Sequence, residues 1–368
     1  MAFKYRGDQV GSLLRPKLLF DARRNPATTP AALRALEDRH VLDVFEKQRA
    51  LGFDIFTDGE LRRRSFMSDF FESTSGWDLE HAVPRTWAGG TASPATVMPV
   101  SGIVRERLQQ TKRLTEYEVA FALRHAPGDV KITLPSANQF PAIAYRPEIS
   151  RAAYPTPSDF LWDIVPIIRD EVLALCEEGV SYVQLDAPRY SYYVDPKWRD
   201  YLRHKMGLDP ERALDEAIRA DNACLEGARG RGVVRGLHMC RGNNQSEWYA
   251  EGGYDAIAEK LFSELDVDVF SLEYDTERAG SFEPLRFVPK GKAVCLGLIS
   301  SKVPALETED ELVRRVDEAT KYVPFENLAL GPQCGFASVE EGNRVSEDDQ
   351  WKKLELVMRT ARRIWGDA

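Results

Sequence analysis

Short apolar runs alternate with longer amphipathic segments along this chain, and that alternation constrains the fold more than any other feature. Strands that alternate with helices form parallel sheets, so eight strand–helix units predict one (β/α)8 barrel, a TIM barrel of α/β class, over residues 1–368. Apolar runs, the expected strands, end at 11–12, 58–60, 134–136, 185–186, 238–240, 272–273, 298–300 and 332–334. Helical spacing is clearest at 31–51, 104–126, 157–179, 209–228, 252–265, 307–323 and 347–365.

The chain is longer than such a barrel needs, because 368 residues exceed the roughly 250 that are typical of the fold. Two segments hold the surplus, at about 61–103 and 137–156, where glycine, proline and aromatic residues lack helical spacing. Within the first of them, 91–103 has the pattern of a hairpin. Long insertions after barrel strands commonly build the rim of an active site, so we expect a rim or lid from both.

The composition of the chain argues against some classes of binding partner and indicates a compartment. The net charge of −9 argues against a general basic surface for nucleic acid or anionic membranes. No apolar stretch approaches the ~20 residues that span a bilayer, and the N-terminus lacks the apolar core of a signal peptide. Five cysteines are few and odd in number, which favours free or metal-bound thiols in a reducing compartment. A cytoplasmic protein is therefore expected, in an oligomeric state that the sequence does not define.

His238 and Cys240 end the apolar run 233–237, which predicts a strand. Residues two apart on a strand face the same side, so an imidazole and a thiol point together there. Zn²⁺ takes nitrogen and sulfur ligands of this kind. The carboxyl ends of barrel strands carry catalytic groups, and here those ends hold Ser12, Glu60, Asp186, His238, Cys240, Glu273 and Cys334.

Each of these residues has a simpler reading when it is taken alone. Glu60, Asp186 and Glu273 follow apolar residues, where a carboxylate is costly unless it meets a metal or a cation, yet a helix cap or salt bridge explains each equally well. A lone buried histidine is usually a hydrogen-bonded core residue. Tryptophans at 77, 87 and 248 fit a pocket lining or core packing, and cysteines at 176, 224 and 295 fit packing.

Several motifs together resemble the catalytic barrel of cobalamin-independent methionine synthase, in its short single-barrel form, and the related epoxyalkane:coenzyme M transferases. These are Val10-Gly11-Ser12, Thr57-Asp58-Gly59-Glu60, Gln184-Leu185-Asp186, His238-Met239-Cys240-Arg241-Gly242-Asn243, Ser271-Leu272-Glu273-Tyr274-Asp275 and Gly331-Pro332-Gln333-Cys334-Gly335-Phe336. The resemblance implies that zinc is held by His238, Cys240, Glu273 and Cys334. It also implies that Ser12, Glu60 and Asp186 hold the amino and carboxylate ends of homocysteine.

The chain differs from that family at the residues expected to serve the methyl donor. The tryptophan expected to face folate has no counterpart near 134–138, and the expected acidic residue after Asp186 is Ala187. The histidine expected to relay a proton is replaced at Ile299, Ser300 or Ser301. The donor is therefore left open between a folate, a corrinoid, a sulfonium and another small alkyl compound.

The sequence thus predicts a zinc-dependent S-methyltransferase of methionine biosynthesis, which activates homocysteine or a similar small thiol as a zinc thiolate. Glu60 and Asp186 would orient the polar end of the thiol, and Glu273, the hardest ligand, would leave the metal when the thiol binds. Further candidates after strand ends are Arg189, Arg241 and Lys302.

Three alternatives stay open at this point. An epoxyalkane-type alkyltransferase would use the same zinc and thiol chemistry. Zinc-activated water would instead give a hydrolase or lyase. A closed shell of four permanent ligands would indicate a structural metal site or a non-catalytic binding barrel.

Overall fold

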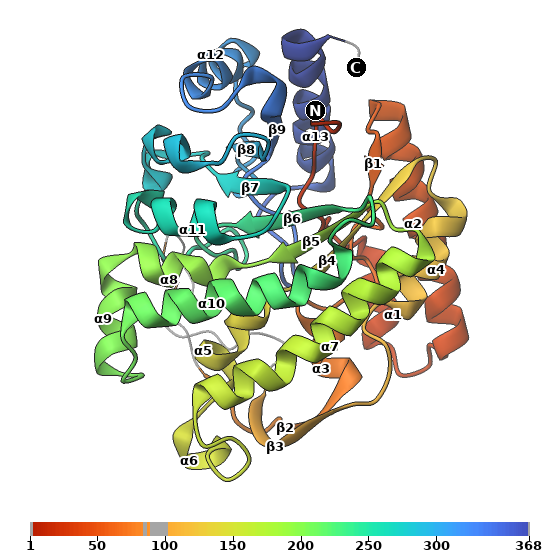
Figure 1. Cartoon of the computed structure of the whole chain (residues 1–368). Helices are drawn as coiled ribbons and strands as arrows, with labels where there is room; N and C mark the ends of the chain where they lie inside the picture. The colour runs from red at the N-terminus through yellow and green to blue at the C-terminus, as the bar shows by residue number, and fades with distance from the viewer. Residues whose placement is uncertain (1–2, 84–86, 89–101, 367–368) are drawn as a thin grey trace.

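The sheet of the computed structural model, which describes residues 3–83, 87–88 and 102–366, contains seven parallel strands that curl around a common core (Figure 1). Their order is β1 (Ile55–Phe56), β4 (Asp129–Pro135), β5 (Tyr182–Asp186), β6 (Val234–Met239), β7 (Val269–Glu273), β8 (Ala293–Ile299) and β9 (Leu328–Pro332). Asp186 pairs with His238 in the register of β5 and β6. The strand ends that carry the candidate residues therefore meet at one edge.

Residues 7–13 close the barrel, but they do so without the full first strand that the sequence predicts. Gly7 forms a single parallel bridge to Leu330 of β9, with Asp8 N–H donating to the Leu330 carbonyl at 2.9 Å. On the other side, Leu13 N–H donates to the Gly59 carbonyl at 2.9 Å. Side chains take the place of further ladder bonds, since the Gln184 amide donates to the Val10 carbonyl at 2.9 Å. The predicted TIM-barrel-like fold is confirmed, but its first strand is reduced to the single bridge at Gly7.

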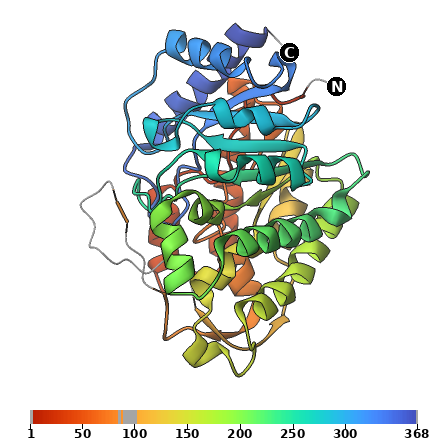
Figure 2. The same ribbon diagram turned by 60° about the vertical axis from the view of Figure 1, so that its left-hand side comes forward.

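Helices cover the outside of the sheet, and their ends follow sequence signals (Figures 1 and 2). Thr156 and Ser346 each form a capping box with an aspartate three residues later, which fixes the start of α7 and of α13. Five predicted helices are confirmed as α2 (Pro30–Leu51), α7 (Pro157–Glu178), α10 (Pro210–Leu225), α12 (Glu309–Ala319) and α13 (Glu347–Trp365). Of the helix predicted at 252–265, only the second half is α-helical, as α11 (Ala258–Glu264). Shorter helices are α1 (Lys17–Arg24), α8 (Ser191–Val194) and α9 (Pro196–His204).

The predicted helix at 104–126 is wrong over its first half. Residues there form β3 (Ile103–Gln110), which pairs antiparallel with β2 (Thr74–Asp78), and only α4 (Glu116–His125) is helical. Pairing with β2 satisfies the backbone of β3 and buries Ile103 and Val104, so tertiary contacts override the helical spacing. The hairpin expected at 91–103 falls mainly outside the described residues.

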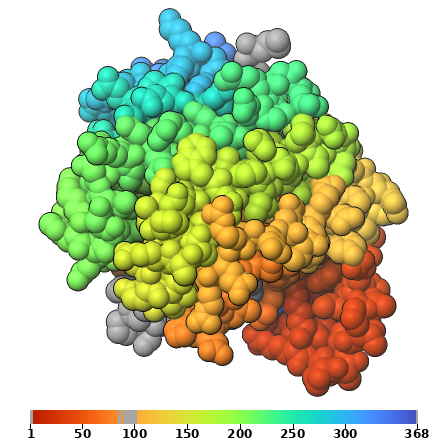
Figure 3. Space-filling view, turned by 60° about the horizontal axis from the view of Figure 1, so that its bottom comes forward, coloured from red at the N-terminus to blue at the C-terminus, as the bar shows by residue number. Residues whose placement is uncertain are grey.

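The two insertions pack against each other. The first contains α3 (Ser68–Ser73) and β2, and the second contains η1 (Ala137–Gln139), α5 (Phe140–Ala144) and α6 (Pro147–Ser150). The Phe70 ring lies 4.4 Å from that of Phe140, and Trp77 contacts Phe71 at 4.6 Å. Figure 3 views this side, where the orange segment lies between the red N-terminal helices and the yellow-green α7. Trp77 is thus a packing residue, and the rim or lid role of the insertions stays a prediction.

Among the described residues, every helix is too short or too polar to span a lipid bilayer. The two ends of the described chain lie together, because the Arg6 guanidinium stacks over the Trp365 ring at 5.5 Å.

Candidate active site

Three predicted metal ligands meet at the carboxyl ends of the strands. His238 is the last residue but one of β6, Cys240 follows that strand directly, and Cys334 lies two residues beyond β9. One nitrogen of His238 and the two sulfurs lie within 4.8 Å of one another. All three side chains are buried, with 3–4% of their surface exposed.

This group has the chemistry of a zinc site. Within the described chain, neither ring nitrogen of His238 has an oxygen or nitrogen hydrogen-bond partner, although a buried imidazole almost always has one. One imidazole and two thiols are ligands that zinc prefers, so the residues fit the metal that the family resemblance implies.

The two thiols differ in pKa because a hydrogen bond between them acts on each in the opposite direction. A hydrogen bond from Cys240 holds the pKa of Cys334 well below its usual value, against the effect of burial and with help from His238. The Cys334 thiolate in turn raises the pKa of Cys240, and burial adds to this. Burial disfavours the charged imidazole, but Cys334 and Asp186 outweigh it and raise the pKa of His238. The pair thus favours the charged form of Cys334 and the neutral form of Cys240.

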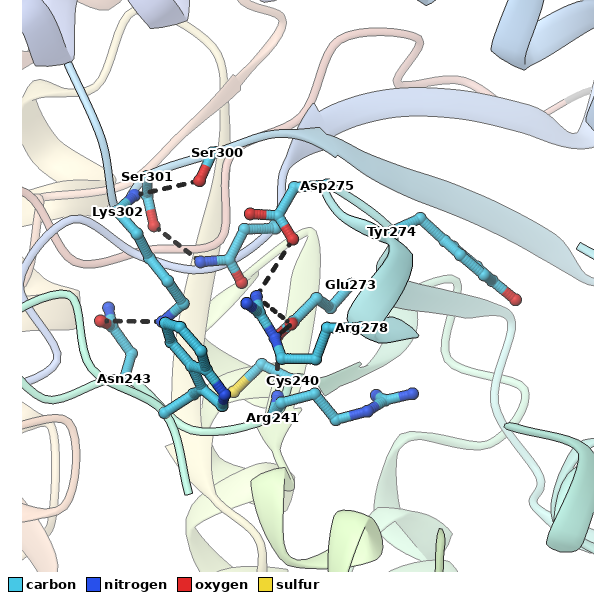
Figure 4. Close-up of polar contacts among 12 residues, drawn as sticks. Cys240, Arg241, Asn243, Glu273, Tyr274, Asp275, Arg278, Ser300, Ser301 and Lys302 are labelled. Carbon is cyan, nitrogen blue, oxygen red and sulfur yellow. Dashed lines mark hydrogen bonds and ion pairs between the residues drawn. The ribbon is translucent and has the colours of Figure 1, made fainter. Parts of the chain in front are cut away.

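Glu273, the fourth predicted ligand, is fully buried and points toward Arg278 (Figure 4). Its Oε1 accepts hydrogen bonds from Arg278, at 2.7 Å from Nη2, and its Oε2 accepts one from the Arg241 backbone N–H at 2.7 Å. Within the described chain, the group bounded by 4.8 Å contains His238 and both cysteines but not this carboxylate. Ligation by Glu273 accordingly stays a prediction.

The predicted substrate-side residues, Ser12, Glu60 and Asp186, line the same cavity as the three metal-binding side chains. Glu60 has a positive φ of 53°, which is rare for a residue with a side chain, and its Oε1 accepts from the Thr133 hydroxyl at 2.8 Å. Its Oε2 has no partner among the residues described. Burial, together with the negative charge of Glu60 and despite His238, raises the pKa of Asp186 to about 7. Two carboxyl groups thus face a space that a cationic group of a ligand can enter.

A close backbone approach holds Ser12 beside the loop that carries Cys334. The Phe336 N–H donates to the Ser12 carbonyl at 2.8 Å. A Cβ on Gly335 would lie only 2.0 Å from the Ser12 hydroxyl oxygen, so a larger residue there would displace the Ser12 side chain. Glycine after Cys334 thus lets the Ser12 hydroxyl keep its place in the site.

Comparison with known proteins agrees with this geometry. Residues 21–347 match the model of the cobalamin-independent synthase catalytic domain. The chain belongs to that family. Over 98% of the chain and 95% of the relative, it is 35% identical to the uncharacterized protein YxjH of Bacillus subtilis. It is 26% identical to a methionine synthase of Pyrococcus abyssi, over 82% of this chain and 76% of that protein.

A solved structure from Listeria monocytogenes, described as a candidate vitamin-B12-independent methionine synthase, has 29% identity and a TM-score of 0.74 over the full length of both chains. The predicted enzyme class, a methyltransferase of the methionine synthase family, is confirmed. The hydrolase and non-catalytic alternatives find no support in these relatives.

Two of the candidate cations support the chain rather than the cavity. Arg241 Nε donates to the Gly252 carbonyl at 3.0 Å, and the Lys302 ammonium donates to the Gly242 carbonyl at 2.8 Å and to Asn243 (Figure 4). Both fix the segment that follows Cys240. The third, Arg189, does line the cavity.

Sequence reasoning missed several residues of the site. Arg278 lies on a short turn five residues after Glu273, and no spacing rule connects the two. Gln139, at the end of η1, and Tyr249, in a loop, line the cavity from segments too short or irregular to give side-chain direction a periodic signal. Of the three candidate tryptophans, Trp87 lines the cavity, and Trp248 instead donates to Glu251 at 2.9 Å.

Proposed function

We propose that this protein is a zinc-dependent S-methyltransferase that methylates homocysteine or a closely similar small amino thiol. One observation carries the proposal: His238, Cys240 and Cys334 converge within 4.8 Å on a cavity that also contains Glu60 and Asp186. A soft metal site beside two carboxyl groups suits a ligand with a sulfur at one end and an ammonium at the other.

Bound Zn²⁺ would stabilise a substrate sulfur as the thiolate, the form that attacks a methyl group at neutral pH. His238, Cys240 and Cys334 are the permanent ligands in this proposal, and Glu273 is the exchangeable fourth. Arg278 and the Arg241 N–H offer the Glu273 carboxylate an alternative set of partners. That carboxylate can therefore give up the metal without being left buried and unpaired.

Asp186 and Glu60 are proposed to bind the ammonium of the thiol, and Ser12 its carboxylate end. We expect Asp186→Asn to raise the KM for homocysteine by about 10- to 100-fold, because a hydrogen bond to a charged group is lost. The KM for 3-mercaptopropionate, a thiol without an amino group, should change little. Equal losses for both thiols in steady-state assays would show that Asp186 does not contact the ammonium.

The function is tested by incubating the zinc-loaded protein with homocysteine and one donor at a time: methyltetrahydrofolate, a methylated corrinoid or a methylsulfonium compound. Mass spectrometry should show methionine with one of these donors and none without protein. Absence of methionine with all three donors, from protein that retains zinc, would reject methyl transfer to homocysteine by any of these compounds.

A further inference from the structure

Arg189 is a buried cation that no group in the described chain neutralises. It lies in the turn η2 (Pro188–Tyr190) after β5, lines the cavity, and exposes 2% of its surface. No described residue forms a hydrogen bond with its Nε or Nη1 atom. Because a guanidinium stays protonated in proteins, a full positive charge is buried here.

The other buried cations around the site are all bonded to oxygen atoms. Arg278 pairs with Glu273 at 2.7 Å, Arg241 donates to the Gly252 carbonyl, and Lys302 donates to the Gly242 carbonyl. Arg189 differs from these three, although burial of an unpaired charge is strongly unfavourable. The missing partner of Arg189 is therefore expected to arrive with a ligand.

Aromatic rings hold Arg189 in a defined orientation. Its guanidinium carbon lies 4.5 Å from the Tyr192 ring centroid and 4.8 Å from that of Tyr249. These rings stabilise the cation but accept no strong hydrogen bond from its N–H groups. Its donors stay available to a carboxylate, sulfonate or phosphate, the planar or tetrahedral oxyanions that arginine binds best.

We propose that Arg189 is an oxyanion-binding residue of this site and determines which substrates the cavity accepts. This inference rests on the proposed function for the identity of the substrates, but not for the binding of the anion. The oxyanion has two possible sources, the carboxylate of the thiol and an acidic group of the methyl donor. Because Glu60 and Asp186 line the same cavity, we expect a zwitterionic ligand, or a set of ligands that carry charges of both signs.

The test compares zinc-loaded wild type, Arg189→Met and the control Arg203→Met, which removes the same charge from an exposed residue of α9 that pairs with Asp200. Sulfate is titrated first and followed by tryptophan fluorescence, because Trp87 lines the cavity 5.4 Å from the Tyr249 ring. Homocysteine and 3-aminopropanethiol, which lacks its carboxylate, are then titrated by calorimetry.

We expect saturable sulfate binding by wild type and Arg203→Met, and a loss of about 10- to 100-fold in Arg189→Met. If Arg189→Met loses as much affinity for homocysteine as for sulfate, while its affinity for 3-aminopropanethiol is unchanged, the oxyanion is the carboxylate of the thiol. Unchanged homocysteine binding assigns it to the donor. If wild type binds sulfate through Arg189 but not homocysteine, the inference stands and the proposed function fails.

Sulfate binding that is absent in wild type or unchanged in Arg189→Met would overturn the proposal. The proposal would also be overturned if Arg189→Met lost affinity for homocysteine and for 3-aminopropanethiol to the same extent, because a merely structural role of Arg189 predicts that result. Arg189→Lys keeps the charge without the forked donors and provides a second variant if the methionine variant does not fold. It should bind sulfate more weakly than wild type while its melting temperature matches that of Arg203→Met.

Discussion

Replacing Cys334 by serine is expected to abolish zinc binding and methyl transfer while leaving the barrel folded. Serine does not ionise at neutral pH, so only His238 and Cys240 of the observed group would remain as ligands. Zinc content should fall from about one atom per chain to about a tenth of that after dialysis, because each ligand contributes strongly to affinity. Metal analysis and circular dichroism on the same sample measure both effects. Cys240→Ser should behave in the same way.

Cys295→Ser is the matched control for this experiment. Cys295 is as buried as Cys334, with 4% of its surface exposed, but it lies within β8 and outside the three-residue group. Its variant should keep zinc and activity. The barrel has its own apolar core, so loss of the metal should leave secondary structure intact. Global unfolding of the Cys334 variant on zinc loss would instead make the metal structural and contradict the catalytic assignment.

The largest effect on stability is expected at Arg63, which lies beneath the substrate side of the site. Its side chain is 1% exposed and contacts Asp69 and Glu118, each at 2.6 Å. It also donates to the Thr133 hydroxyl at 3.1 Å, and that hydroxyl bonds Glu60. Arg63→Met should lower the free energy of unfolding by about 3 to 5 kcal/mol, because two buried carboxylates lose their cation. Chemical denaturation measures this change.

The destabilisation by Arg63→Met should depend on pH. Burial raises the pKa of Asp69 and of Glu118, and the charge of Arg63 opposes that rise, so removal of Arg63 should raise both pKa values further. A carboxyl group whose pKa is higher in the folded than in the unfolded chain lowers the free energy of unfolding as pH rises, and this loss grows with the pKa difference. The deficit should therefore be smaller at pH 5 than at pH 8. Arg64→Met, at a neighbouring exposed residue, should stay within about 0.5 kcal/mol at both values, and equal effects of the two variants would refute a special role for Arg63.

The barrel could be predicted because each strand end combines an apolar run with a polar stop, and each long helix carries its own cap and apolar face. The failures lie where tertiary pairing decides. Residues 103–110 have helical spacing but pair with β2, and the first strand contributes only the bridge at Gly7. Neither outcome is encoded in a local period, because both depend on a partner that is distant in the chain.

The site was predictable to the extent that strand ends position it. Six of the seven predicted residues line one cavity, because side chains at the carboxyl ends of parallel strands converge. The contacts of Glu273 with Arg278 and of Arg189 with two tyrosines could not be predicted, because short turns, the short helix α8 and a loop present these partners, and none of them has a sequence period that places its side chains. Lys302, which supports the segment after Cys240, also lies outside the helices and strands.

The central claim is that His238, Cys240 and Cys334 hold zinc with room for a sulfur from outside the chain. Zinc K-edge absorption on the zinc-loaded protein tests it most directly, before and after addition of homocysteine. We expect two sulfur scatterers from the two cysteines, rising to three with homocysteine, while an oxygen scatterer is lost as Glu273 leaves. A sulfur count that stays at two when homocysteine saturates the protein would contradict the account.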